Sequence, residues 1–137
     1  MPQVNCITEL GVFENCTSLV DVKFSPNLLS IGNRAFYNCH LLQNADFISS
    51  VASIGDSSFC HCSGLTSVSL PSTLTSIGIN VFSNCDGLTL VSVCCNTSKY
   101  NTNIFSNCSN LKNAFFSDGV SGVAPGMFMR CSSLSSV

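Results

Sequence analysis

The sequence repeats itself every 23 residues. Phenylalanine, cysteine and leucine recur in that order, each three residues after the last, in six copies with no insertion or deletion between them. The phenylalanines are Phe13, Phe36, Phe59, Phe82, Phe105 and Phe128, and the cysteines are Cys16, Cys39, Cys62, Cys85, Cys108 and Cys131. A fixed period of this length is the signature of a repeat architecture, so we expect stacked coils with the phenylalanines in one internal column.

Each unit predicts one short strand and a return segment. Residues 65–70 read Leu-Thr-Ser-Val-Ser-Leu, so Val68 and Leu70 should point to one face and the serines to the other. The Ile77-Gly78 pair that follows suits a tight bend. The Phe-x-x-Cys run is typical of a short helical turn with both side chains inward. One unit cannot bury its apolar side alone, so the strands of successive units should stack in parallel.

The unit L-x-x-V-x-L-P-x-x-L-x-x-I-G-x-x-x-F-x-x-C, clearest at residues 65–85, resembles the BspA-type leucine-rich repeat over essentially the whole chain. The resemblance implies an α/β solenoid, a right-handed leucine-rich repeat superhelix. It would carry a parallel β-sheet on the concave face and short helical or irregular turns on the convex face. The resemblance also implies a surface or secreted protein that adheres to host proteins, host cells or other microbes.

The repeat divides the chain into regular units within a single leucine-rich repeat solenoid, 1–137. Full repeats are expected at 19–41, 42–64, 65–87, 88–110 and 111–133, with a partial repeat at 1–18 and a truncated one at 134–137. The pattern departs at 94–104, where Thr97, Tyr100 and Asn101 replace the expected Leu, Ile and Gly, so this coil should be looser. Solenoids ordinarily need polar caps, and none is readable, which suggests a fragment and offers end-to-end self-association through the terminal repeats.

The low charge narrows the classes of partner. Charged residues make up 9% of the chain and the formal net charge is −2, which gives no footprint for nucleic acid and no polybasic attraction to a membrane. No apolar run approaches the roughly 20 residues of a membrane-spanning helix. Residues 1–10 show no signal peptide. The missing leader favours the cytoplasm and the family resemblance favours the cell surface, so localisation stays open.

Ten cysteines raise the question of disulfides or metal. Equivalent positions in adjacent coils lie about 4.8 Å apart with parallel Cβ vectors, which suits a disulfide poorly, so the six periodic cysteines are expected to be buried free thiols. Four others lie outside the period: Cys6, Cys60, Cys94 and Cys95. The C-x₂₋₄-C spacing of structural zinc sites is absent, so we expect no metal; a chance zinc or copper site near His40 and a redox thiol at Cys60 or Cys95 are the alternatives.

No group of residues meets the requirements of a catalytic site, so we expect no enzyme and no cofactor. Three glycosylation sequons begin at Asn15, Asn96 and Asn107. Asn15 and Asn107 fall on the Asn-Cys step of the repeat and are interpreted as turn asparagines whose side chains bond backbone. Asn96 is the better candidate for a glycan, provided the chain enters a secretory pathway.

The outward positions of the predicted strands form the candidate binding face, because solenoids use their extended concave surface for recognition. Its residues are Asp21, Lys23, Asn44, Asp46, Ile48, Ser67, Ser69, Leu90, Ser92, Asn113 and Phe115. Ile48, Leu90 and Phe115 would be exposed apolar side chains within a polar surround, as in an interaction patch. We therefore predict a protein-interaction module, and the resemblance to the BspA-type family implies that it serves adhesion, with a host or microbial surface protein as partner. The alternative is a structural spacer repeat in a larger surface protein.

Overall fold

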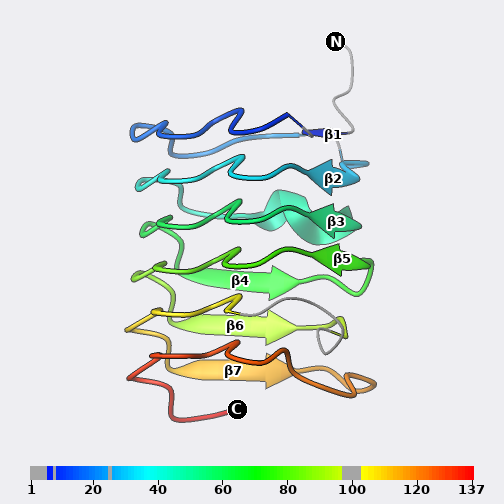
Figure 1. Cartoon of the computed structure of the whole chain (residues 1–137), viewed down its shortest axis with the longest axis vertical. Helices are drawn as coiled ribbons and strands as arrows, with labels where there is room; N and C mark the ends of the chain where they lie inside the picture. The colour runs from blue at the N-terminus through cyan, green and yellow to red at the C-terminus, as the bar shows by residue number, and fades with distance from the viewer. Residues whose placement is uncertain (1–5, 8, 25, 97–102) are drawn as a thin grey trace.

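The computed structural model shows a chain wound into a stack of flat coils, with its N- and C-termini at opposite ends of the stack (Figure 1). The structure describes residues 6–7, 9–24, 26–96 and 103–137. The departure from the repeat expected at Thr97, Tyr100 and Asn101 lies outside these residues. Within the described residues, the coils follow the 23-residue period of the sequence.

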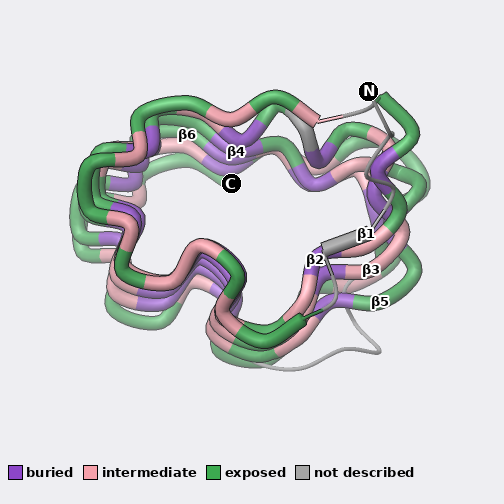
Figure 2. Tube along the Cα trace, turned by 90° about the horizontal axis from the view of Figure 1, so that it is seen from above, coloured by how far each residue is buried: buried purple, intermediate pink, exposed green. Residues whose placement is uncertain are grey.

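Two parallel sheets run along the stack on different sides of the coils (Figure 2). The first consists of two-residue strands in the order β1 (Cys6–Ile7), β2 (Ser30–Ile31), β3 (Ser53–Ile54) and β5 (Ser76–Ile77). The second consists of β4 (Ser67–Leu70), β6 (Leu90–Val93) and β7 (Asn113–Phe116). In the strands from β2 onward, each residue pairs with its equivalent 23 residues away, as Val68 does with Val91. β1 pairs with β2 at a separation of 24 residues, as Cys6 does with Ser30.

The described fold is a β-solenoid of parallel strands with almost no helix, and this corrects the α/β expectation. None of the described residues lies in an α-helix, and the one helical segment is the 3₁₀ helix η1 (Asp46–Ser50). The Phe-x-x-Cys turns close through single bonds such as Cys39 N to Phe36 O, 3.2 Å. Asn38, between them, has a φ of +65°, and a left-handed residue at that point stops a right-handed helix from continuing.

The strand predicted for every unit forms in only three successive coils. Residues 19–24 form no strand, and the next coil carries η1 at the equivalent place. The Ile77-Gly78 pair is interpreted from the sequence as a tight bend, and the structure adds that Ile77 ends the strand β5, which the sequence did not predict. The predicted parallel stacking is confirmed, but the second sheet has fewer strands than expected.

The phenylalanine column is confirmed as a continuous stack through the interior. Neighbouring rings from Phe13 to Phe128 have centroids 4.9–5.9 Å apart and are inclined by 7–14°. The four inner rings are fully buried and the two end rings are half-buried. Stacked aromatic rings at this separation contribute roughly 0.5–1.5 kcal/mol a pair beyond their burial.

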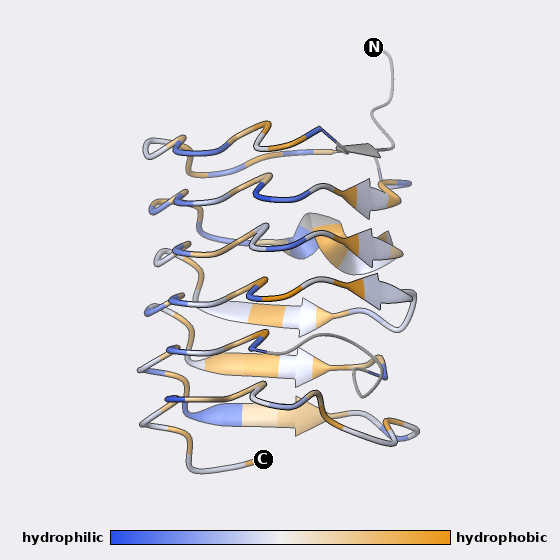
Figure 3. Cartoon of the chain, viewed as in Figure 1, coloured by the Kyte–Doolittle hydropathy of each residue, from blue (hydrophilic) through white to orange (hydrophobic). Residues whose placement is uncertain are grey.

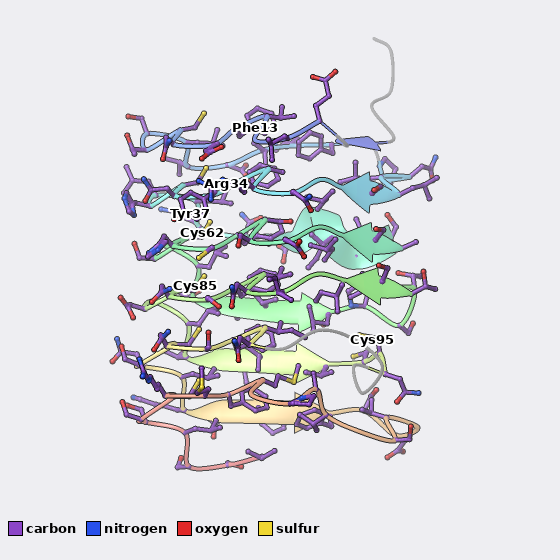
Figure 4. All side chains as sticks on the ribbon, viewed as in Figure 1. Phe13, Arg34, Tyr37, Cys62, Cys85 and Cys95 are labelled. Carbon is purple, nitrogen blue, oxygen red and sulfur yellow. The ribbon has the colours of Figure 1, made fainter. Side chains whose placement is uncertain are left out.

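The cysteine column is also confirmed as free thiols. All nine cysteines whose side chains are described are free, and the thiol of Cys6 is outside that set. Each periodic thiol from Cys39 to Cys131 donates to the carbonyl oxygen of the phenylalanine 26 residues earlier, at 3.0–3.2 Å. Figure 4 shows the sulfur atoms of Cys62 and Cys85 one above the other along the stack. The thiols therefore connect successive coils and fill the core as well.

Candidate binding surface

The outer face of the second sheet, formed by β4, β6 and β7, presents the residues that alternation places outward. In β4, Val68 and Leu70 are buried while Ser67 and Ser69 are exposed, as predicted. In β6 and β7 the most exposed apolar side chains are Leu90 and Phe115, with 36% and 55% of their surface accessible. Figure 3 shows polar and apolar residues alternating along β4, whereas β7 is hydrophilic at its start and apolar after it.

Strand register arranges these residues in two rows across the sheet. The first row is Ser67, Leu90 and Asn113, and the second is Ser69, Ser92 and Phe115. Leu90 and Phe115 therefore lie on adjacent strands in neighbouring rows, with serine beside each. The structure brings together on one sheet the six expected binding residues that come from these three strands.

The expected binding residues of the first two coils lie before this sheet and outside any strand, Asp21, Lys23 and Asn44 on irregular backbone and Asp46 at the start of η1. Asp21, Lys23 and Asp46 are exposed and Asn44 is half-buried. Asn44 Nδ2 donates to Asp21 Oδ1 at 3.4 Å, and these two residues are one 23-residue period apart. These residues continue the polar rows, but no strand fixes them.

Ile48 was expected on the exposed face, and this is wrong because Ile48 has only 2% of its surface accessible. The 3₁₀ helix η1 has three residues a turn, so it turns Ala45, Ile48 and Val51 to the same side. Ile48 N donates to Ala45 O at 3.1 Å and Val51 N donates to Ile48 O at 3.0 Å. The three-residue spacing of these apolar residues is the sequence signal for η1, which a prediction from strand alternation leaves out.

An open groove with a volume of about 630 Å³ lies between η1 and the second sheet. Asp46 and Ser49 line it from η1, Ser67 and Ser69 from β4, and Leu90 from β6. Its volume is within the range of about 300–1,000 Å³ typical of ligand clefts. The groove thus joins the polar and apolar parts of the expected binding face.

Comparison with known proteins agrees with this architecture. The family model described as the BspA type leucine rich repeat region, in six copies, matches residues 4–112 and again residues 65–137. The chain belongs to the BspA-type leucine-rich repeat family. None of the curated proteins matches it.

Two solved structures resemble this BspA-type chain. A leucine rich cell surface protein from Faecalibacterium prausnitzii A2-165 is 31% identical with a TM-score of 0.72, over 90% of this chain and 31% of that one. A leucine-rich repeat protein from Bacteroides ovatus ATCC 8483 is 23% identical with a TM-score of 0.63, over 97% of this chain and 40% of that one. The chain therefore spans between about a third and two fifths of these proteins. Among its described residues, no helix has the length and apolar character to cross a bilayer.

Three cysteines outside the repeat have described side chains in this BspA-type chain, namely Cys60, Cys94 and Cys95. Among the residues whose structure is described, no three His, Cys, Asp or Glu side chains converge as metal ligands would. Cys60 is buried, and burial raises the pKa of its thiol. Burial also raises the pKa of Cys95 to about 11. A redox thiol needs a lowered pKa, so neither residue has the environment that such a role requires.

A charged and aromatic cluster on the outer turns was missed by the sequence analysis. Arg34 donates to Glu14 through Nε at 3.0 Å and through Nη2, and its guanidinium lies 3.7 Å from the centroid of the Tyr37 ring. The Tyr37 ring meets His61 edge to face at 5.6 Å. Figure 4 shows Arg34 and Tyr37 at the end of the coils away from the first sheet. The contacts of Arg34 with Glu14 and of Tyr37 with His61 join neighbouring coils, so their separation in the sequence hides them.

The sequon asparagines Asn15 and Asn107 lie in turns, with φ of +61° and +58°, which confirms the predicted turn but not the predicted bond from side chain to backbone. The side chain of Asn15 contacts the next coil, since Asn38 Nδ2 donates to Asn15 Oδ1 at 2.9 Å. Asn96 is exposed, and its Oδ1 accepts from Ser121 N at 2.6 Å. The residues that complete its sequon, Thr97 and Ser98, are outside the described part of the chain.

Proposed function

We propose that this chain is a protein-interaction module that binds a partner protein through the outer face of β4, β6 and β7 and the adjoining groove. The observation that carries the proposal is the combination of that groove with Leu90 and Phe115, exposed on the same sheet. Apolar side chains with a polar surround, next to a cleft, are typical of recognition surfaces. The leucine rich cell surface protein of Faecalibacterium supports a surface location.

The proposal includes two features of the superhelix. We propose that the coils wind right-handedly, because connections between parallel strands of one sheet are right-handed in about 98% of cases. We also propose that β4, β6 and β7 form the concave side, since solenoids use that side for extended contacts. The partner would be a protein on a host cell or on another microbe.

Binding to cells tests this function. Fluorescently labelled chain is titrated onto cultured epithelial cells and onto bacterial cells, and bound fluorescence is measured by flow cytometry. The variant with Leu90→Ser and Phe115→Ser should lose at least about tenfold in affinity, since exposed apolar anchors carry much of a binding energy. The matched control carries Leu29→Ser and Leu41→Ser, two side chains that are each 53% exposed elsewhere on the coils.

A structural spacer with no binding activity of its own is the second candidate. It is favoured by the length of the similar structures, of which this chain spans 31% and 40%. The two candidates predict different results in the same titration. Saturable binding that the control retains and the double variant loses supports the interaction module. Absence of saturable binding to both cell types, or equal loss in both variants, supports the spacer.

A further inference from the structure

The backbone of β4 turns alternate residues toward β6 and toward the preceding coil. Cys94 N donates to Leu70 O at 3.0 Å, and Thr89 N donates to Thr66 O at 3.0 Å, so residues of this parity face β6. In a parallel sheet, successive residues direct their N–H and C=O groups to opposite neighbours. The N–H and C=O groups of Ser67 and Ser69 therefore face the coil that precedes β4.

That coil has no strand to pair with β4. It carries η1 at the equivalent place (Figure 1), and the carbonyl oxygen of Ala45 accepts from Ile48 N within the helix. Among the described residues, no backbone hydrogen bond joins β4 to residues 42–50. Pro71 has no N–H to offer at the position where Cys94 and Ser117 donate to their preceding coils. The second sheet thus ends at β4 with an open edge.

The groove lies along this open edge. Ser67 and Ser69 line it from the sheet, and both are exposed. Their side chains are small and add little bulk beside the backbone of this edge. Among the described residues that line the groove, Asp46 is the one charged side chain, so the groove carries a single negative charge. An unpaired row of N–H and C=O groups is a template for another strand.

We propose that this groove binds an extended peptide segment of the partner, which adds to the edge of β4 as a strand and places a lysine or arginine against Asp46. One residue of the added strand can donate its N–H to Ser67 O and accept the N–H of Ser69. Strand addition of this kind obtains affinity from the main chain and specificity from side-chain contacts. The inference rests on the proposed interaction function and names the form of ligand that the face takes.

A phage-displayed library of random dodecapeptides is the probe, and the most enriched sequence is synthesised for titration by fluorescence anisotropy. We expect enriched sequences to contain a basic residue and few prolines. Ser69→Pro removes the N–H that would donate a hydrogen bond to the peptide. It should weaken binding by at least about tenfold, since proline has no N–H to donate to a neighbouring strand. Ser69→Ala keeps that N–H and should bind clearly more tightly than Ser69→Pro. Asp46→Asn should weaken binding severalfold.

A measurement on the unaltered protein tests the inference even if the Ser69→Pro variant does not fold. Methylating each backbone nitrogen of the peptide in turn should abolish binding at alternate positions, because only alternate residues of a strand face the edge. A library without enriched sequences, or a peptide that binds Ser69→Pro and every methylated form equally well, overturns the inference. Cell binding that depends on Leu90 and Phe115 is measured separately, so the interaction function can stand if strand addition fails.

Discussion

The thiol of Cys85 donates a hydrogen bond to the carbonyl oxygen of Phe59, 26 residues earlier, at a distance of 3.1 Å. The same oxygen accepts the backbone N–H of Cys62 at 3.2 Å. One carbonyl therefore closes the turn of its own coil and receives the side chain of the next. This relationship explains why the repeat keeps cysteine at this position, since alanine would fill part of the same space without a donor.

Replacing that thiol tests its contribution to stability. Cys85→Ala removes a weak donor and leaves a small void in a fully buried position, so we expect a loss of about 1–2 kcal/mol in the free energy of unfolding. Urea unfolding followed by circular dichroism measures it. The control is Cys16→Ala, at a half-buried place in the first coil, which should cost less. Equal costs at the two sites would contradict a specific role for the inner thiols.

The buried thiols make stability depend on alkaline pH. Burial raises the pKa of Cys39 to about 11 and holds that of Cys85 well above its usual range, whereas thiols of the unfolded chain titrate near about 8.5. Between these values the unfolded chain releases protons that the folded chain keeps, so the unfolded state is favoured as pH rises. The urea midpoint should therefore fall steadily from about pH 8.5 to about pH 11.

Lysine and tyrosine titrate in part of the same range, so the cysteine contribution needs its own control. The Cys85→Ala variant should show a shallower fall of the urea midpoint than the parent over that pH interval. A midpoint that is constant up to about pH 10, below the pKa of about 11 for Cys39, would contradict the assignment.

The ring stack predicts a position-dependent cost for losing phenylalanine. Phe82 is fully buried between two rings, at 4.9 Å from Phe59 and 5.4 Å from Phe105. Phe82→Ala should lower the free energy of unfolding by about 3–5 kcal/mol through the cavity that it leaves. Phe128 is half-buried and stacks on one ring of the column, so Phe128→Ala should cost clearly less. Equal midpoints for the two variants in urea would contradict the continuous stack.

Glycine at position 78 is required by the approach of the neighbouring coil. Its Cβ would lie 2.6 Å from the backbone nitrogen of Asp56, and the Asp56 Oδ1 that accepts Ile79 N would also be in contact. Gly78→Ala should therefore cost about 1–3 kcal/mol, as overpacking generally does. Ser76→Ala, two residues away and exposed, should stay within about 0.5 kcal/mol in the same urea measurement. A Gly78→Ala variant as stable as Ser76→Ala would contradict this account.

The sequence predicts the features that depend on one residue type recurring in one column. The phenylalanine stack and the free thiols follow from the period alone, because equivalent residues of stacked coils must touch. The alternation in residues 65–70 likewise predicts which side chains of β4 are exposed. Leu90 and Phe115 were expected on the surface for this reason, and both are there.

Features that arise between coils could not be read in the same way. The two-residue strands such as Ser30–Ile31 are too short to show a period, and only pairing with the next coil defines them. The contact of Arg34 with Glu14 joins residues 20 apart in the sequence. The open edge of β4 arises because the preceding coil has no strand to pair with it. The helix η1 replaces a strand because Ala45, Ile48 and Val51 are three residues apart, which competes with alternation.

A substitution at Ile48 tests whether its segment is the 3₁₀ helix η1 or the strand that alternation predicts. Because its side chain is buried beneath η1, Ile48→Ala should lower the free energy of unfolding by about 2–5 kcal/mol. On an exposed strand face the same change would stay within about 0.5 kcal/mol, as we expect for Ser49→Ala on the exposed side of the helix. Urea unfolding of both variants gives the comparison. A negligible cost for Ile48→Ala would return this segment to the strand that alternation predicts, and the groove beside β4 would lose its wall.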